Sequence, residues 1–426
     1  MTGIPKNKNA WYWVPLLYFT QGIPYIMVVT VSVIMYKRLG ISNADIGLYT
    51  SWLYLPWVIK PLWSPFVDLK STKRNWFLLM QLIISLAFLG IGLTLQTNIF
   101  FVTTLACFWM AAFASATHDI AADGYYLIGL TEKKQSFFIG VRSTFYRLAM
   151  ITGQGLLVIL AGFLENQYGD NAKAWSMTMI CAAVLMLALT ISNFFATPKF
   201  ESAFSKSLEK PTSFFEVFAS FFKKKQIWLG LAFVLTYRLG ESQLVKMASP
   251  FLLDEKEAGG LALSTEAVGT IYGTVGLIML SLGGILGGIL ISRDGLKKWM
   301  LPMILALNLP NVLYAILAIT KTSSLVAVVG TVVLEQFGYG FGFAAFLMYL
   351  IYLAEGASKT SHYAIATGFM ALGMMLPGMI SGYVQEWLGY GGFFIWVVIA
   401  AIPAIILLQF LKYPADYGKK STVNDG

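Results

Sequence analysis

Four carboxylates lie inside long apolar stretches of the chain, where an ionisable side chain is costly. They are Asp119, Asp123, Glu241 and Glu335. A charged group in hydrocarbon is unfavourable unless it is paired or faces water, so such residues are typical of ion and proton pathways. Their placement therefore predicts ion pairing or proton exchange as the chemistry of this chain.

Asp119 and Asp123 are spaced i, i+4, which places both side chains on one face of a helix. The next apolar stretch carries Arg142 and Arg147, and in an antiparallel hairpin these arginines lie at the depth of the two carboxylates. We therefore expect two ion pairs, Asp123 with Arg142 and Asp119 with Arg147. Two interpretations remain open: fixed salt bridges that hold the hairpin together, or a pair that opens so that one carboxylate takes up a proton.

The second half of the chain carries fewer cations at its embedded carboxylates. Arg238 and Glu241 are spaced i, i+3 and can pair within one helix. Glu335 has no cation within one helical turn, so it is either protonated or paired with Arg238. We expect proton uptake at Glu335 or Glu241, while an anionic substrate competes for Arg238.

Other polar residues in apolar stretches carry weaker signals. Gln21 lies close to Pro24, which predicts a local helix break with exposed backbone groups. His118 is either a proton relay or a packed, hydrogen-bonded side chain, and the second interpretation is favoured. Both cysteines fall in apolar stretches, so they predict neither a disulfide nor a metal site.

Enzymatic and ATP-driven functions are not expected. A membrane enzyme needs an embedded nucleophile or histidine constellation, and His118 alone does not make one. The chain has no Gly-x-x-x-x-Gly-Lys-Ser/Thr loop, which excludes a primary ATP-driven pump for this chain. We expect no cofactor and no metal.

The elements that position these residues follow from composition. Apolar residues make up 57% of the 426 positions and charged residues only 12%, too few to give a water-soluble surface. About 20 apolar residues are needed for each membrane-spanning helix. The apolar runs predict an all-α polytopic membrane protein with twelve helices in two six-helix halves, 1–196 and 227–426, joined by a basic cytoplasmic linker, 197–226. The predicted spans are 11–36, 46–66, 76–95, 99–127, 137–164, 175–196, 227–253, 268–291, 299–319, 325–353, 363–388 and 393–411.

The positive charges predict the orientation. Most of the 30 Lys and Arg residues fall in the termini and in the loops on the same side as the termini. Basic loops resist translocation, so both termini are expected in the cytoplasm. The net charge of +9 therefore indicates how the chain is oriented in the membrane and does not indicate a nucleic-acid-binding surface.

Two cytoplasmic loops at corresponding places in the two halves carry related charge patterns. The first contains Asp68, Lys73 and Arg74, and the second keeps basic positions that include Arg293 but has Ser292 at the acidic one. These clusters either set topology alone or form a conformational latch, in which an acidic residue pairs with basic residues and the dipole of a neighbouring helix. We favour the latch.

Two six-helix halves with a basic linker resemble the major facilitator superfamily, and the loop pattern above resembles its motif between helices 2 and 3. Within that superfamily, several fragments are similar to the AmpG-type muropeptide permeases. They are Gln21-Gly-Ile-Pro24, Lys60-Pro-Leu-Trp-Ser-Pro65, Ala114-Ser-Ala-Thr-His-Asp-Ile-Ala-Ala-Asp123, Tyr146-Arg147-Leu148, Tyr237-Arg238-Leu-Gly-Glu241 and Glu335-Gln336.

This resemblance implies a proton-driven importer of anhydro-muropeptides in the bacterial inner membrane, acting as a monomer on a small-molecule substrate, a sugar or sugar-peptide, with lipid and protons as its other partners. It implies a central cavity lined by Gln21, Asp119, Asp123, Arg147, Arg238, Glu241 and Glu335, with Lys60 a further candidate. Arg142 is not a feature of the family. A permease for an anhydro-sugar, another small sugar or a disaccharide, and a proton-coupled exporter, are the alternatives.

Overall fold

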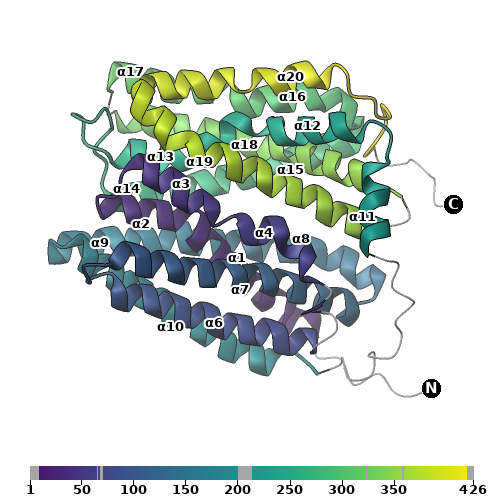
Figure 1. Ribbon diagram of the computed structural model, residues 1–426, viewed down its shortest axis with the longest axis horizontal. Coiled ribbons are helices and arrows are strands. Elements are labelled where there is room, and N and C mark those ends of the chain that lie inside the picture. The colour runs from purple at the N-terminus through teal and green to yellow at the C-terminus, as the bar shows by residue number, and fades with distance from the viewer. Residues whose placement is uncertain are drawn as a thin grey trace. The chain divides into compact units, whose positions relative to one another are not determined.

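The computed structural model describes residues 9–64, 66–67, 71–199, 214–322, 324–356 and 359–419, and these residues form helices with no β-strand (Figure 1). Nine helical stretches among them are, by length and composition, able to cross a membrane. They are Ala10–Arg38, Lys73–Thr94, Phe100–Gly129, Gly140–Tyr168, Asn171–Ala196, Thr265–Asp294, Leu296–Thr320, Leu325–Ala354 and Ser361–Leu408. The predicted all-α polytopic fold class is confirmed.

The last of these stretches covers the predicted span 363–388 and most of the span 393–411. It runs through α19 (Lys359–Ile399) and α20 (Ile402–Leu408). The helix of α19 is interrupted at Gly389, with φ 66° and ψ 171°. Only glycine adopts this conformation readily, because it has no Cβ. The predicted loop between the two spans is therefore a single-residue break.

Two predicted spans are divided into short helices and are not among these nine stretches, so the count of twelve continuous spans is not confirmed in full. The predicted span 46–66 forms α3 (Asn43–Trp52), α4 (Leu55–Ile59) and η3 (Lys60–Leu62). Pro56 and Pro61 lie in this stretch, and proline removes a helical hydrogen bond and restricts the residue before it. The predicted span 227–253 forms α12 (Ile227–Tyr237) and α13 (Leu239–Leu253), divided at Arg238.

Contacts group the described residues into two units. Unit 1 is drawn from Met1–Ile41, Leu53–Pro211 and Ser264–Thr274. Besides α4 and η3, it contains η1 (Ala10–Tyr12), α1 (Val14–Ile26), α2 (Ser32–Arg38), α6 (Lys73–Thr94), α7 (Phe100–Gly129), α8 (Glu132–Met150), α9 (Val158–Tyr168), α10 (Asn171–Ala196), α14 (Thr265–Thr270), and the π-helices η2 (Met27–Val31) and η4 (Ile151–Leu157).

Unit 2 is drawn from Ser42–Trp52, Thr212–Leu263 and Val275–Gly426. Besides α3, α12, α13, α19 and α20, it contains α11 (Phe214–Phe222), α15 (Leu277–Asp294), α16 (Leu296–Asn308), α17 (Asn311–Thr320) and α18 (Leu325–Ala354). A third π-helix, η6 (Ile271–Gly276), contains the boundary at Thr274. The units differ from the predicted halves by two short segments, and the division at 197–226 stays a prediction.

Each unit has an aromatic core of its own. In unit 1, Trp13 and Phe77 pack edge-on against Tyr125, with ring centroids 5.0 and 5.2 Å apart. In unit 2, Tyr237 stacks on Phe346 at 4.6 Å. Large apolar side chains elsewhere point away from any core, which suits helices that face lipid.

Candidate functional site

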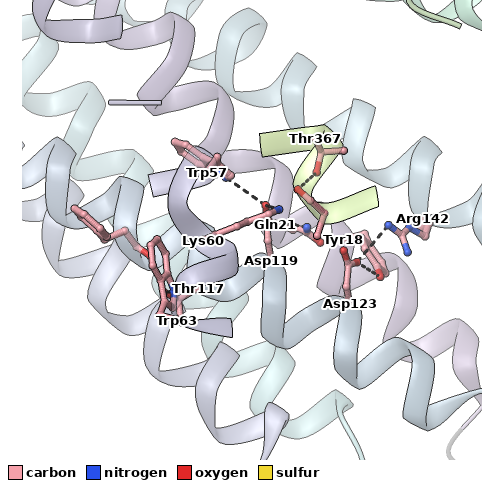
Figure 2. A network of polar contacts seen from close by, with 12 residues as sticks. Tyr18, Gln21, Trp57, Lys60, Trp63, Thr117, Asp119, Asp123, Arg142 and Thr367 are labelled. Carbon is pink, nitrogen blue, oxygen red and sulfur yellow. Dashed lines mark hydrogen bonds and ion pairs between the residues drawn. The ribbon is translucent and has the colours of Figure 1, made fainter. Parts of the chain in front are cut away.

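Asp119 of α7 is the centre of a polar cluster in unit 1 (Figure 2). Gln21 Nε2 of α1 donates to Asp119 Oδ1 at 2.7 Å, and Trp57 Nε1 of α4 donates to Asp119 Oδ2 at 3.2 Å. Lys60 Nζ lies 3.8 Å from the same Oδ2. One cation and two neutral donors thus stabilise the carboxylate, whose side chain is 18% exposed.

Asp123, one helical turn further along α7, has a different environment (Figure 2). Tyr18 OH donates to Asp123 Oδ1 at 2.8 Å, and Arg142 Nη2 lies 3.2 Å from that oxygen. The guanidinium of Arg142 also lies over the rings of Tyr18 and Tyr126, 4.4 and 5.2 Å from their centroids. The predicted Asp123–Arg142 ion pair is confirmed. The side chain of Asp123 is 45% exposed, so this carboxylate is the more accessible of the two.

The predicted pair of Asp119 with Arg147 is wrong. Among the described contacts of Asp119 the cation is Lys60, and no ion pair between Asp119 and Arg147 occurs in that part of the chain. The prediction paired residues at equal depth in the hairpin of α7 and α8 and took no account of other helices. The broken helix 46–66 brings η3 against α7. Lys60, a secondary candidate in the sequence, therefore occupies the place assigned to Arg147.

Local features of α1 bring Gln21 and Tyr18 to these carboxylates. The two residues are spaced i, i+3 and share a helix face. Gly22 lies against α8 so closely that a Cβ there would be 2.7 Å from Ala149 Cβ and 2.8 Å from Tyr146 O. Pro24 lies within α1, and π-helix η2 follows it, which agrees with the predicted irregularity. A glycine contact and an irregular helix thus set the approach of α1.

In unit 2, Arg238 lies at the break between α12 and α13. Its guanidinium lies over the rings of Tyr339 and Phe343, at 4.9 and 5.0 Å, and it donates a hydrogen bond to Tyr339 OH. The residue is buried. A guanidinium held between aromatic rings keeps its charge and remains able to attract an anion.

Glu241 and Glu335 are both fully buried within unit 2. Glu335 accepts hydrogen bonds from Gln336 Nε2 at 3.0 and 3.1 Å and from Tyr314 OH at 3.4 Å. Within the described residues, neither oxygen of Glu241 has a hydrogen-bond partner, and neither glutamate forms an ion pair. The expected close pairing of Arg238 with one of them is therefore not found in that part of the chain.

The predicted latch residues have contacts within their own units. Arg74 Nε donates to Thr197 O and Oγ1, both at 3.1 Å, and so caps the C-terminal end of α10. Arg293 pairs with the adjacent Asp294 at 2.9 Å. Lys73 is buried, and its side chain lies against Gly124. Asp68 lies outside the described residues, so the latch stays a prediction.

His118 is a packed side chain, as favoured from the sequence: its Nε2 lies 2.9 Å from Gln81 Nε2, and both residues are buried. Sequence reasoning missed Tyr18, Trp57 and Tyr339 as partners of the charged residues. The spacing of Tyr18 to Gln21 would have indicated the first. The other two depend on contacts between helices distant in sequence.

Comparison with known proteins extends this picture. A family model described as Major Facilitator Superfamily matches residues 16–354. Anhydromuropeptide permease of Escherichia coli (strain K12) is 26% identical over 422 residues, covering 96% of this chain and 80% of that protein. Putative transporter AmpG 4 of Rickettsia conorii is 25% identical, covering 93% of this chain and 95% of the relative.

Solved structures share the fold. The nucleoside transporter NupG matches with a TM-score of 0.71 at 19% identity, over 94% of this chain and 98% of that chain. A D-xylose-proton symporter matches with a TM-score of 0.71 at 13% identity, over 96% and 98%. The fold and relatives define a multi-pass membrane transporter for a small molecule. The chain belongs to the Major Facilitator Superfamily.

Proposed function

We propose that this transporter imports anhydro-muropeptides or their anhydro-sugars across the bacterial inner membrane, driven by the proton gradient, as a monomer with both termini in the cytoplasm. The observation that carries the proposal is the cluster at Asp119. Its partners Gln21 and Lys60 and the carboxylate itself come from three separate fragments that resemble the AmpG-type permeases, and they meet at one point. Relatives named anhydromuropeptide permease and AmpG support the same substrate class.

The chemistry around Asp119 suits a sugar that carries acidic groups. Trp57 packs edge-on against Tyr25 at 5.4 Å, and Tyr25 lies 6.3 Å from Tyr146. Sugar rings have apolar faces that pack on aromatic rings, while hydroxyl and amide groups need a few polar partners at fixed positions. Gln21 and Asp119 supply such partners. Lys60 and Arg142 supply positive charge for the carboxylates of a muropeptide.

Proton coupling is assigned to Glu241 and Glu335. A carboxylate is costly to bury as an anion, so two fully buried glutamates are suitable places to carry a proton. A substrate anion competes with these carboxylates for Arg238, which links binding of the substrate to proton uptake at Glu241 or Glu335. Binding of the substrate and binding of the proton are then coupled through Arg238, and no conformational change is needed to connect the two sites.

Uptake by reconstituted vesicles tests the proposal. Labelled anhydro-muropeptide, anhydro-sugar and common disaccharides are offered with and without an imposed inward proton gradient. We expect accumulation of the anhydro compounds only with the gradient. Glu255→Gln serves as a control carboxylate variant, because Glu255 is exposed in the loop after α13. Accumulation independent of the gradient would reject coupling, and transport of disaccharides alone would reject the substrate.

A further inference from the structure

The helix α11 (Phe214–Phe222) lies within the predicted linker, and Figure 1 shows it running across the direction of α12. Phenylalanine occupies five of its nine positions. The predicted span 227–253 begins at Ile227, shortly after α11 ends. A helix that crosses the start of a span and is this rich in apolar side chains is placed at the membrane surface.

One face of α11 is held by the other helices of unit 2. Phe221 is fully buried, and its ring centroid lies 5.4 Å from that of His362, near the start of α19. Ser220 Oγ lies 2.9 Å from Nε2 of the same histidine. Just after the helix, Lys224 Nζ donates to two backbone carbonyls at the C-terminal end of α18, at 2.6 and 2.8 Å. These contacts fix the orientation of α11 within unit 2.

A second face of α11 carries aromatic rings that protein does not cover fully. Phe218 and Phe222 are spaced i, i+4 and share this face, with ring centroids 5.0 Å apart. Trp228, at the start of α12, extends the row, since its ring lies 5.3 Å from that of Phe222. Phe218 is 40% exposed and Trp228 is 69% exposed. A row of three rings with this much exposed area indicates an apolar partner.

A third face of α11 is charged. Lys223 continues the last turn, because its N–H donates to Ala219 O at 3.2 Å. Glu216 and Lys223 are spaced i, i+7, so they share a face, and both are exposed, as is Lys225. Within the part of the chain that the structure describes, neither Lys223 nor Lys225 forms an ion pair. A protein-bound face, an apolar face and a charged face are typical of a helix at the membrane surface.

The chemistry of the two exposed faces distinguishes between partners. Aromatic rings at the end of a span are suited to lipid at the membrane–water interface, which a water-soluble protein does not enter. Lysine side chains lie with their apolar stems along such groups while the ammonium reaches the headgroups. A zwitterionic headgroup has no net charge, whereas an anionic headgroup attracts nearby lysines. Two exposed lysines beside three aromatic rings therefore favour an anionic lipid.

We propose that α11 and the start of α12 form a binding surface for anionic phospholipid. Its residues are Phe218, Phe222, Lys223, Lys225 and Trp228. The rings contact acyl chains, and the ammonium groups bind headgroup phosphates. Because α11 contacts the end of α18 and the start of α19, lipid bound here holds both helix ends at the membrane surface. This inference does not depend on the proposed substrate or on proton coupling.

Spin labels test whether the aromatic face contacts lipid. In a background with Cys107 and Cys181 replaced by alanine, Phe218→Cys or Glu216→Cys carries a nitroxide in vesicles of phosphatidylcholine and phosphatidylglycerol. Residues two apart point to nearly opposite sides of a helix. We therefore expect the label of Phe218→Cys to collide more with oxygen than with a water-soluble nickel complex, and the label of Glu216→Cys to show the reverse. Greater access of the nickel complex at both positions would overturn the proposal.

A second measurement tests the preference for anionic lipid. A fluorophore on Phe218→Cys is quenched by phosphatidylglycerol or phosphatidylcholine, each with a nitroxide on the same acyl carbon. We expect phosphatidylglycerol to quench equally at an about fivefold lower fraction of the lipid. The double variant Lys223→Gln, Lys225→Gln is expected to lose this preference.

The matched control is Lys256→Gln combined with Lys321→Gln, which removes two exposed lysines elsewhere in unit 2. This control is expected to keep the preference for phosphatidylglycerol. Equal quenching by the two lipids, or the same loss in the control, would overturn the proposal. Shielding of the fluorophore from both lipids would overturn it as well and would indicate a contact between two copies of the chain. Neither measurement uses a transported substrate, so failure of wild-type uptake would reject the proposed function alone.

Discussion

Asp119 has two neutral hydrogen-bond donors and one cation as partners, so its replacement tests whether the cluster in unit 1 serves transport. We expect Asp119→Asn to lower uptake by at least about tenfold, because a charge-assisted hydrogen bond contributes about 1.5–3 kcal/mol. The measurement is initial uptake by vesicles with equal amounts of protein. Lys60→Met combined with Asp119→Asn removes both charges. If the double variant is no worse than the single one, the two residues act as a pair.

Glu335 provides the test of coupling. Glu335→Gln keeps the size of the side chain and its capacity to accept from Gln336, but it cannot release a proton. We expect loss of gradient-driven accumulation with substrate exchange at equal pH preserved. The two assays use the same vesicles. Normal accumulation by Glu335→Gln, together with its loss in Asp119→Asn, would assign coupling to α7 instead.

Contacts between individual residues could be predicted from the sequence where the two residues lie on adjacent, regular helices. The Asp123–Arg142 pair follows from equal depth in a hairpin, and the structure has it. The Asp119–Lys60 pair depends on how a proline-broken helix turns toward α7, and no local pattern determines that direction. Aromatic contacts of Arg238 were missed for the same reason, since Tyr339 and Phe343 lie about a hundred residues away.

At the scale of elements, the approach of α1 to α8 depends on Gly22. We expect Gly22→Ala to destabilise the protein by about 1–3 kcal/mol, because the added methyl group meets Ala149 Cβ and the Tyr146 carbonyl. Displacement of α1 also moves Gln21 from Asp119, so uptake falls as well. Thermal unfolding in detergent and vesicle uptake measure the two effects.

Gly140, on α8, is the matched control for this substitution. No atom of the described residues lies within 4 Å of a Cβ added there. Alanine is favoured over glycine in helices by about 1 kcal/mol, so Gly140→Ala is expected to be neutral or slightly stabilising. Equal effects of the two substitutions would show that the α1–α8 contact tolerates a methyl group.

Long apolar runs predicted the helices well, because lipid requires continuous backbone hydrogen bonding over the width of the membrane. The interruptions were harder to predict. Pro56 and Pro61 gave a signal for the break after Trp52, but the break at Arg238 has no proline or glycine at that position. Apolar periodicity does not distinguish one continuous span from two half-helices with a polar residue between them.

At the scale of the whole molecule, the distribution of positive charge predicts the orientation. With native cysteines replaced by alanine, Glu257→Cys places a thiol in the loop between α13 and α14, and Glu355→Cys places one after α18. We expect a membrane-impermeant thiol reagent to label the first in intact cells and the second only after permeabilisation. The reverse pattern would place both termini outside the cytoplasm.

Two halves and a basic linker are predicted from apolar runs and lysines, since both are properties of sequence alone, and this division stays a prediction. The packing of Ser42–Trp52 and Ser264–Thr274 was not, because it is decided by contacts between segments more than a hundred residues apart. Such contacts depend on glycines that let two backbones approach closely and on single hydrogen bonds. Neither leaves a periodic signal in one sequence.

The π-helix η2 has a consequence for the history of this chain. A π-turn contains one residue more than the α-turn it replaces, so it arises by a single insertion. Each residue turns a helix by about 100°. The extra residue therefore determines which face each end of the first span, Ala10–Arg38, presents to its neighbours. One end presents Tyr18 and Gln21 to α7, and the other presents Arg38 to Glu165. A one-residue deletion in Met27–Val31 would restore a regular helix and yet turn one of these ends away from its partners.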